Sequence, residues 1–243
     1  MNLILDIGNT ASKYFLFDDD ELVSYDHESG HALAFIDDLP VAPEAAIVSS
    51  VVDLPEEAHE RLRCLPCPIV WFTADMPIPL TNLYRTPKTL GTDRLAAALG
   101  AWTPHPHHPL LIIDAGSCIT FDFVTAEGKY IGGNIAPGLH ARLRAIGDYF
   151  PRLPLVDAEG DVPEMGYDTE TAIRAGVIEG LKHEIEGYIH AFSAKYPELF
   201  VFLTGGDEIR FVNPSTCPIF ADKFLVPHGL NAVLRQQTNH KQQ

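Results

Sequence analysis

The sequence predicts an α/β protein made of two like domains. Short apolar segments with strand character alternate along the chain with segments whose apolar residues recur at helical spacing. A stretch of histidines and prolines, Pro104–Pro109, interrupts this order near the middle and is typical of a stiff connector. The segment that follows the connector is similar to the start of the chain. Together these observations predict one domain over residues 1–105 and a second over residues 106–243.

The similar segments are LILDIGNTASKYFLF at residues 3–17 and LLIIDAGSCITFDFV at residues 110–124. A shift of 108 residues places Asp114 on Asp6, and each segment then reads as a strand ending in an acid, a tight turn and a second strand. A repeat of this size favours two like halves, although two unrelated β-hairpins could show the same similarity. The other matches at this shift are Gly116 with Gly8, Ser117 with Asn9, Cys118 with Thr10 and Phe123 with Phe15.

The remaining elements follow from periodicity and from turn residues. Strands are predicted at 21–25, 45–52, 68–72, 129–131, 200–204 and 217–220, and helices at 31–38, 54–63, 139–150 and 228–236. Thr92 and Thr169 are the predicted N-caps of two further helices, because each precedes an apolar helical stripe. Ala175, Gly176 and Gly180 on the second of these helices would allow another helix to pack closely, including one from a second subunit.

Composition excludes several classes of protein. The net charge of −16 argues against nucleic acid as a partner, since phosphate backbones require a basic surface. No apolar run reaches the ~18 residues of a membrane span, and the N-terminus lacks the features of a signal peptide. We therefore expect a cytoplasmic protein that binds neither nucleic acid nor membrane. Cys64 and Cys67 form a C-x-x-C pair that leaves redox and zinc roles open, but unpaired thiols fit a reducing compartment better.

The first hairpin has the side chains of a phosphate site. Its turn brings backbone N–H groups, the Asn9 amide, the Thr10 hydroxyl and the Lys13 ammonium close to the Asp6 carboxylate, and phosphates with their counter-cation need that mixture. The alternative is an ordinary β-hairpin whose asparagine and threonine serve the turn.

A second carboxylate, Asp93, follows a long irregular segment over residues 73–90 and stands at a predicted helix start. One interpretation is a favourable charge at the helix N-terminus. The other is a catalytic base beside Arg94, with Gly91 allowing a ligand to approach the backbone. Phosphoryl transfer to a hydroxyl requires one such carboxylate, and the strand ends at Asp6, Asp114 and Gly205-Gly206 would converge on a cleft between two like domains. The Walker A and Rossmann glycine patterns are absent from the sequence.

Five motifs carry a resemblance to type III pantothenate kinases, and they occur in that family's order over nearly the whole chain. They are D-I-G-N-T-x-x-K at residues 6–13, G-T-D-R at 91–94, D-A-G-S-x-x-T at 114–120, G-G-N-I-A-P-G at 132–138 and T-G-G-D at 204–207. The resemblance implies two duplicated RNase H-like (actin-like ATPase) domains with mixed sheets around an inter-domain cleft. It also implies a homodimer that phosphorylates pantothenate to 4′-phosphopantothenate with ATP, the first step of coenzyme A biosynthesis.

The resemblance further implies roles for individual residues. Asp93 would accept the proton, and Asp114 would bind a monovalent cation, potassium or ammonium; a divalent cation, expected to be magnesium, would accompany the nucleotide. The family usually has threonine where this chain has Ser117, and a hydroxyl is retained. The implied nucleotide contacts are Asp6, Gly8, Asn9, Thr10, Lys13, Ser117, Gly205 and Gly206, and the implied pantothenate contacts are Tyr84, Gly91, Thr92, Asp93, Arg94 and Thr169.

Two alternatives share the fold. A kinase for another small metabolite would keep the three strand ends but would not need Tyr84 with Gly91–Arg94. A non-catalytic ATP-binding accessory protein, related to transcription, would not need Asp93.

Overall fold

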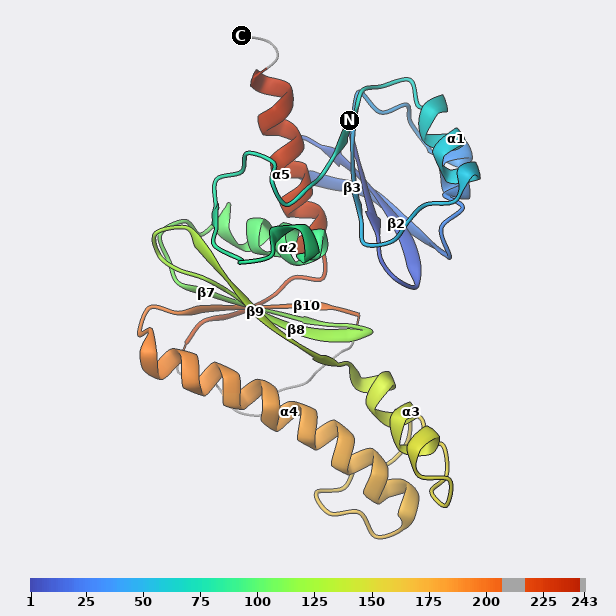
Figure 1. Cartoon of the computed structure of the whole chain (residues 1–243), viewed down its shortest axis with the longest axis vertical. Coiled ribbons are helices and arrows are strands. Elements are labelled where there is room, and N and C mark those ends of the chain that lie inside the picture. The colour runs from blue at the N-terminus through green and yellow to red at the C-terminus, as the bar shows by residue number, and fades with distance from the viewer. Residues whose placement is uncertain (207–216, 241–243) are drawn as a thin grey trace. The chain divides into compact units, whose positions relative to one another are not determined.

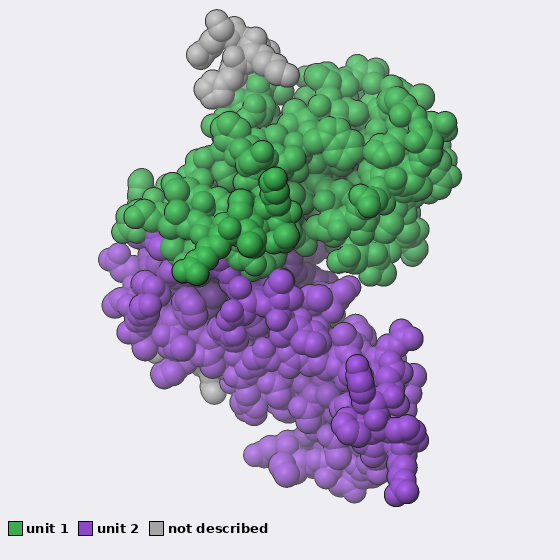
Figure 2. Space-filling model, viewed as in Figure 1, with its two compact units in different colours: residues 1–107, 127–131, 224–243 green, residues 108–126, 132–223 purple. Residues whose placement is uncertain are grey.

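Two mixed β-sheets with the same order of strands form the framework of the chain (Figure 1). The computed structural model describes residues 1–206 and 217–240. Contacts divide the chain into two compact units, coloured separately in Figure 2. Unit 1 contains residues 1–107, 127–131 and 224–243, and unit 2 contains residues 108–126 and 132–223. None of the helices in the described ranges is both long enough and apolar enough to cross a membrane.

Unit 1 is organised on a five-stranded sheet in the order β3-β2-β1-β4-β5. β1 runs antiparallel to β2 and parallel to β4, so the sheet is antiparallel on the hairpin side of β1 and parallel on the other side. Its strands are β1 Asn2–Ile7, β2 Ala11–Asp18, β3 Glu21–Ser29, β4 Ala45–Ser50 and β5 Ile69–Trp71. The short β6 Thr81–Asn82 also belongs to unit 1 but lies outside this sheet, paired with residues 129–130. The helices are the 3-10 helices η1 Ala34–Asp38 and η2 Pro87–Thr89 and the α-helices α1 Glu56–Cys64, α2 Thr92–Trp102 and α5 Leu225–His240.

The second sheet has the order β11-β10-β7-β8-β9-β6, and its first five strands repeat this arrangement. β7 is antiparallel to β8 and parallel to β10, as β1 is to β2 and β4. The elements are β7 Leu110–Ala115, β8 Cys118–Val124, β9 Lys129–Pro137, α3 Leu139–Tyr149, α4 Thr169–Lys195, β10 Phe200–Gly205 and β11 Ile219–Ala221. The prediction of a duplicated α/β fold with mixed sheets is confirmed by the shared strand order.

The repeat is one residue shorter in its second turn than the shift of 108 assumes. Asp6 pairs with Lys13 across the first hairpin, whereas Asp114 pairs with Thr120 across the second. The match of Asp114 with Asp6 therefore stands, but beyond the turn the shift is 107. Cys118 consequently corresponds to Ala11 instead of Thr10, and Asp122 instead of Phe123 corresponds to Phe15.

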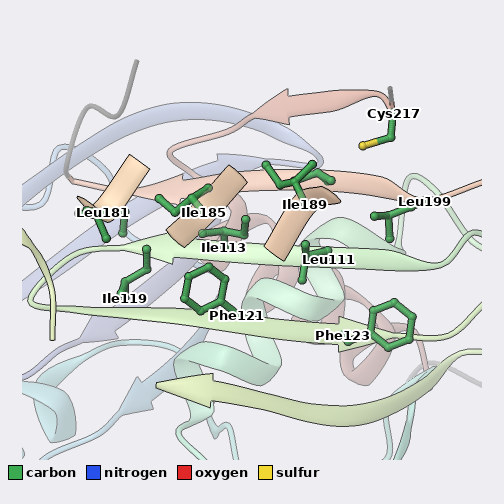
Figure 3. Close-up of a cluster of buried hydrophobic side chains, with 12 residues drawn as sticks. Leu111, Ile113, Ile119, Phe121, Phe123, Leu181, Ile185, Ile189, Leu199 and Cys217 are labelled. Atoms are coloured by element: carbon green, nitrogen blue, oxygen red, sulfur yellow. The ribbon is translucent and has the colours of Figure 1, made fainter. Parts of the chain in front are cut away.

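Alternation along the strands gives each sheet one largely apolar face. In unit 1, Leu3, Leu5 and Ile7 pack with α1 and η1 in one buried cluster. In unit 2, Leu111 and Ile113 of β7 and Phe121 of β8 face α4, whose Leu181, Ile185 and Ile189 lie over them (Figure 3). Because successive side chains point to opposite faces, Asp6 and Asp114 lie on the face turned away from these clusters.

The last helix, α5, belongs to unit 1, although the predicted boundary at residue 105 assigned it to the second domain. α5 crosses α2 and packs against it (Figure 1). Their backbones approach closely at Gly100 and Gly229: a Cβ at Gly100 would collide with the Leu225 carbonyl oxygen, and one at Gly229 with that of Ala96. Glycine at both positions makes the close contact possible, and this contact joins residues 224–240 to unit 1.

The structure also corrects the two predicted N-caps. Gly91, not Thr92, is the N-cap of α2. Asp168, not Thr169, is the N-cap of α4, because its carboxylate accepts the Thr171 N–H while Thr171 returns a bond to the Asp168 N–H. This is a capping box one residue earlier than predicted.

Candidate functional site

The first hairpin carries its polar residues at and beside the turn between β1 and β2. Gly8 donates its N–H to the Ala11 carbonyl oxygen at 3.0 Å, which closes the turn. Asn9 and Thr10 are exposed at its tip. Lys13 is exposed on β2, opposite Asp6 of β1, so the ammonium and the carboxylate lie on the same face. The predicted nucleotide contacts of the first repeat therefore surround one surface turn.

The Asp6 carboxyl group titrates unusually. Its pKa is raised from 3.8 to about 6, chiefly because burial removes water from the carboxylate. Lys13 opposes this rise, while the negative charge of Asp93 adds to it. Asp6 and Asp93, far apart in the sequence, are thus near enough to repel each other. The positive charge of Lys13 partly offsets the rise in the pKa of Asp6. Such a site favours a cation or the proton of a reacting hydroxyl.

The start of α2 holds Asp93 in a fixed orientation. The Asp93 carboxylate accepts the Arg94 N–H at 2.8 Å, as expected of an acid at a helix N-terminus. It folds back over Gly91, where a Cβ would collide with Asp93 Oδ1. Thr92 turns its hydroxyl toward β4, accepting a hydrogen bond from Ser49 Oγ at 2.9 Å and donating to the Ser50 carbonyl oxygen at 3.4 Å. This geometry is compatible with both interpretations of Asp93, as a favourable charge at the helix N-terminus and as a catalytic carboxylate.

Arg94 and Tyr84 form the adjoining wall. The Arg94 guanidinium is buried and lies 5.8 Å from the centroid of the Tyr84 ring. The Tyr84 ring lies in turn 6.5 Å from that of Tyr130. β6 positions this tyrosine, because Thr81 and Asn82 pair with the first residues of β9 and the Asn82 side chain accepts the Tyr84 N–H. The long irregular segment is thereby ordered next to α2.

In unit 2 the second hairpin and β10 bring a similar set of residues together. Asp114 lies beside Thr204 and Ala115 beside Gly205 in the parallel β7–β10 pair. Gly205 has a φ of +104°, and a Cβ there would collide with the Ala115 carbonyl oxygen, so both conformation and space require glycine. Ser117 and Gly206 are exposed. Asp207, the last residue of the T-G-G-D motif, lies outside the described residues.

Thr169 begins α4 in unit 2, whereas Tyr84 and Gly91–Arg94 belong to unit 1. It follows the Asp168 cap, whose pKa is lowered by the hydrogen bonds from Thr171. The loop before the cap is anchored by Arg174, which is buried and donates to the carbonyl oxygens of Asp157 and Asp161.

Asp114 is the carboxylate that the described part of the second hairpin offers to a cation. Asp114 Oδ1 lies 4.0 Å from the point where a Cβ of Gly116 would stand, so the carboxylate leans over the turn. Across residues 1–206 and 217–240, no group of three or more histidine, cysteine or acidic side chains could hold a metal ion. Cys64 and Cys67 are free thiols in the described part of the chain.

Ser49 is not among the site residues predicted from the sequence. It lies opposite Asp6 in the parallel β1–β4 pair and is 1% exposed. The available signal was a pair of serines closing the otherwise apolar segment A-A-I-V-S-S, but the sequence gives no indication of which helix their hydroxyls would meet.

A family model and a full-length relative of known family indicate the same family. The family model described as type III pantothenate kinase matches residues 2–191. A type III pantothenate kinase from Bacteroides fragilis is 50% identical over 236 residues, covering 96% of this chain and 97% of the relative. Among solved structures, a protein described as a conserved Baf family transcriptional activator from Campylobacter jejuni aligns with a TM-score of 0.65 at 20% identity, covering 98% of this chain and 99% of that chain. An inorganic polyphosphate/ATP-glucomannokinase from Arthrobacter aligns with a TM-score of 0.50 at 14% identity, covering 98% and 100%. The two structural matches show a shared fold.

Proposed function

The chain belongs to the type III pantothenate kinase family, and we propose that it transfers the γ-phosphoryl group of ATP to pantothenate with Asp93 as the proton acceptor. The product is 4′-phosphopantothenate, and the reaction is the first step of coenzyme A biosynthesis. The observation that carries the assignment of Asp93 is its fixed place at the start of α2, beside the buried Arg94 and close enough to Asp6 of the phosphate-type hairpin for the two charges to interact.

Different residues of unit 1 bind the phosphates, accept the proton and contact pantothenate. The hairpin tip with Asn9, Thr10 and Lys13 binds and orients the phosphates, since an exposed ammonium and turn amides stabilise negative charge. Asp93, fixed by the Arg94 N–H, takes the proton of the attacking hydroxyl. Because hydrogen bonds to β4 occupy the Thr92 hydroxyl, Thr92 serves pantothenate through its backbone at the helix start.

Tyr84 and Arg94 bind the acceptor as one wall, in which the ring covers the guanidinium. Thr169 is assigned to pantothenate from unit 2. Ser117, Gly205 and Gly206 contact the nucleotide, and Asp114 holds potassium or ammonium. The divalent ion that accompanies ATP, taken to be magnesium, neutralises phosphate charge when bound.

We further propose that the protein acts as a cytoplasmic homodimer. Large apolar side chains of residues 149–167 are exposed: Tyr149 79%, Phe150 58%, Leu155 72%, Met165 83% and Tyr167 70%. Beside them α4 presents Gly176 and Gly180, where an added Cβ would meet no described atom within 4 Å other than the backbone of its own helix and its chain neighbours. An apolar patch next to a smooth helix face is typical of an interface between subunits. Free thiols and the use of ATP support a cytoplasmic location.

Release of ADP tests the reaction. We expect wild-type protein with ATP and magnesium to release ADP only when pantothenate is present, and faster in potassium than in sodium buffer. Asp93→Asn is expected to reduce kcat by about 10²–10⁴-fold, whereas Asp75→Asn, which removes an exposed loop carboxylate in the same unit, should leave kcat unchanged. Equal ADP release with and without pantothenate would contradict the reaction, and full activity of Asp93→Asn would contradict the assigned base.

Light scattering tests the assembly. Wild-type protein is expected at twice the mass of one chain, and Gly180→Glu at the mass of one. Ala194→Glu, on an exposed position near the other end of α4, should keep the dimer. A wild-type monomer, or a dimer that Gly180→Glu leaves intact, would rule out this interface.

A further inference from the structure

Ser49 places a hydroxyl in the buried part of β4, directly after four buried apolar residues. Residues 45–48 of β4 are all buried, and Ser49 is 1% exposed. A buried hydroxyl is costly unless it forms a hydrogen bond. Ser49 lies opposite Asp6, and neighbours in a parallel pair point to the same face of the sheet. This is the face that α2 and α5 contact in unit 1.

The Ser49 hydroxyl is bonded to the first residue of α2. Ser49 Oγ donates to Thr92 Oγ1 at 2.9 Å, and Thr92 Oγ1 donates to the Ser50 carbonyl oxygen at 3.4 Å. The N-cap of α2 is Gly91, which has no side chain to hold the helix start. A short chain of hydroxyls therefore ties the first turn of α2 to the end of β4.

We propose that Ser49 is a positioning residue for phosphoryl transfer, acting through Thr92 on Asp93; this inference rests on the proposed function. Asp93 directly follows Thr92, and its charge reaches Asp6, the strand neighbour of Ser49. Displacement of the helix start would move the Asp93 carboxylate relative to the acceptor hydroxyl while leaving the hairpin tip in place. Small misplacements of a catalytic group are costly in rate because the reacting atoms must be aligned.

The neighbouring Ser50 provides a matched control. Its Oγ donates to the Val52 carbonyl oxygen at 2.7 Å and accepts the Val52 N–H at 3.3 Å. The Ser50 hydroxyl therefore closes a local turn and forms no hydrogen bond with the Thr92 hydroxyl. Ser50→Ala thus removes a serine hydroxyl at the same strand end without removing the side-chain bond to α2.

The test compares Ser49→Thr with Ser49→Val, because these side chains have nearly the same shape and differ by the hydroxyl. We expect Ser49→Val and Ser49→Ala to lower kcat for pantothenate phosphorylation about tenfold, with the KM for ATP changed less than twofold. Ser49→Thr is expected to recover most of the kcat lost in Ser49→Val, and Ser50→Ala to retain wild-type kcat. Thermal melting of each variant measures stability separately, and Ser49→Ala provides the comparison if Ser49→Val does not fold.

A double variant tests the route through Thr92. Combining Ser49→Ala with Thr92→Val should lower kcat no further than Thr92→Val alone, since Thr92→Val already removes the hydrogen bond to Ser49. Unchanged kcat in Ser49→Ala, no difference between Ser49→Thr and Ser49→Val, or additive losses in the double variant would each overturn the inference. If wild-type protein showed no pantothenate-dependent ADP release, the proposed function would fail and the inference with it, whereas an inactive Asp93→Asn beside a fully active Ser49→Ala would overturn the inference alone.

Discussion

Replacement of Asp6 by asparagine is expected to stabilise the free protein while it removes a nucleotide contact. The pKa of Asp6 rises from 3.8 to about 6 in the folded state, where burial disfavours the charged form and Asp93 adds repulsion. The folded protein therefore binds a proton more tightly than the unfolded chain at this position. Between these two pKa values, folding stability falls as the pH rises, because the carboxylate must ionise in an unfavourable place.

The size of the effect follows from the shift. A change of about 2.2 pH units, at 1.36 kcal/mol per unit, corresponds to about 3 kcal/mol above pH 7 and to about 1 kcal/mol at pH 4.5. The upper figure is a ceiling, since Asp6 is partly exposed and water reduces the cost. Asp6→Asn carries no charge at any of these pH values, so we expect it to recover most of that free energy at pH 8 and much less at pH 4.5.

Urea unfolding of wild-type and Asp6→Asn protein at pH 8 and pH 4.5 measures the difference. Asp18→Asn, at the exposed end of β2, is the control and should change the free energy of unfolding by less than about 0.5 kcal/mol. The reasoning is refuted if Asp6→Asn is destabilising at pH 8, or if its stabilisation is the same at both pH values.

Three further variants probe other parts of the chain. Gly100→Ala forces a methyl group against the Leu225 carbonyl oxygen and should lower the free energy of unfolding by about 2 kcal/mol, seen as a lower melting temperature; an unchanged melting temperature would contradict the close helix contact. Tyr84→Ala uncovers the Arg94 guanidinium and should raise the KM for pantothenate about three- to tenfold, while Tyr84→Phe keeps the ring and the KM; equal KM values for both would contradict a role of the ring. Arg174→Met removes the buried donor that anchors the loop before α4 and should make that loop susceptible to limited proteolysis, whereas an unaltered digest would show that the loop is held by other contacts.

Much of the fold was predictable because it depends on local patterns. Short apolar runs identified β1, β2 and β4, helical spacing identified α1, α2 and α4, and the acid at two strand ends revealed the duplication. The helix N-caps and the length of the second hairpin turn were harder to predict from the sequence. Asp168 and Thr169 are both acceptable N-caps by residue type, and the choice follows from the bond that Thr171 returns. The shortening of the second turn by one residue is visible only in the pairing of Asp114 with Thr120.

The sequence by itself determined the kinds of elements, the repeated hairpin and the family to which the chain belongs, because each depends on residues close together in the chain or on whole motifs. Only the tertiary structure decided that α5 packs on α2 in unit 1, that Asp93 is near enough to Asp6 to raise its pKa, and that Ser49 binds the Thr92 hydroxyl. Ser49 and Thr92 are 43 residues apart in the chain. Residue type and periodicity identify a buried strand and a helix start, but their meeting depends on how the whole sheet closes against the helices, since packing of the two faces fixes which side chains touch.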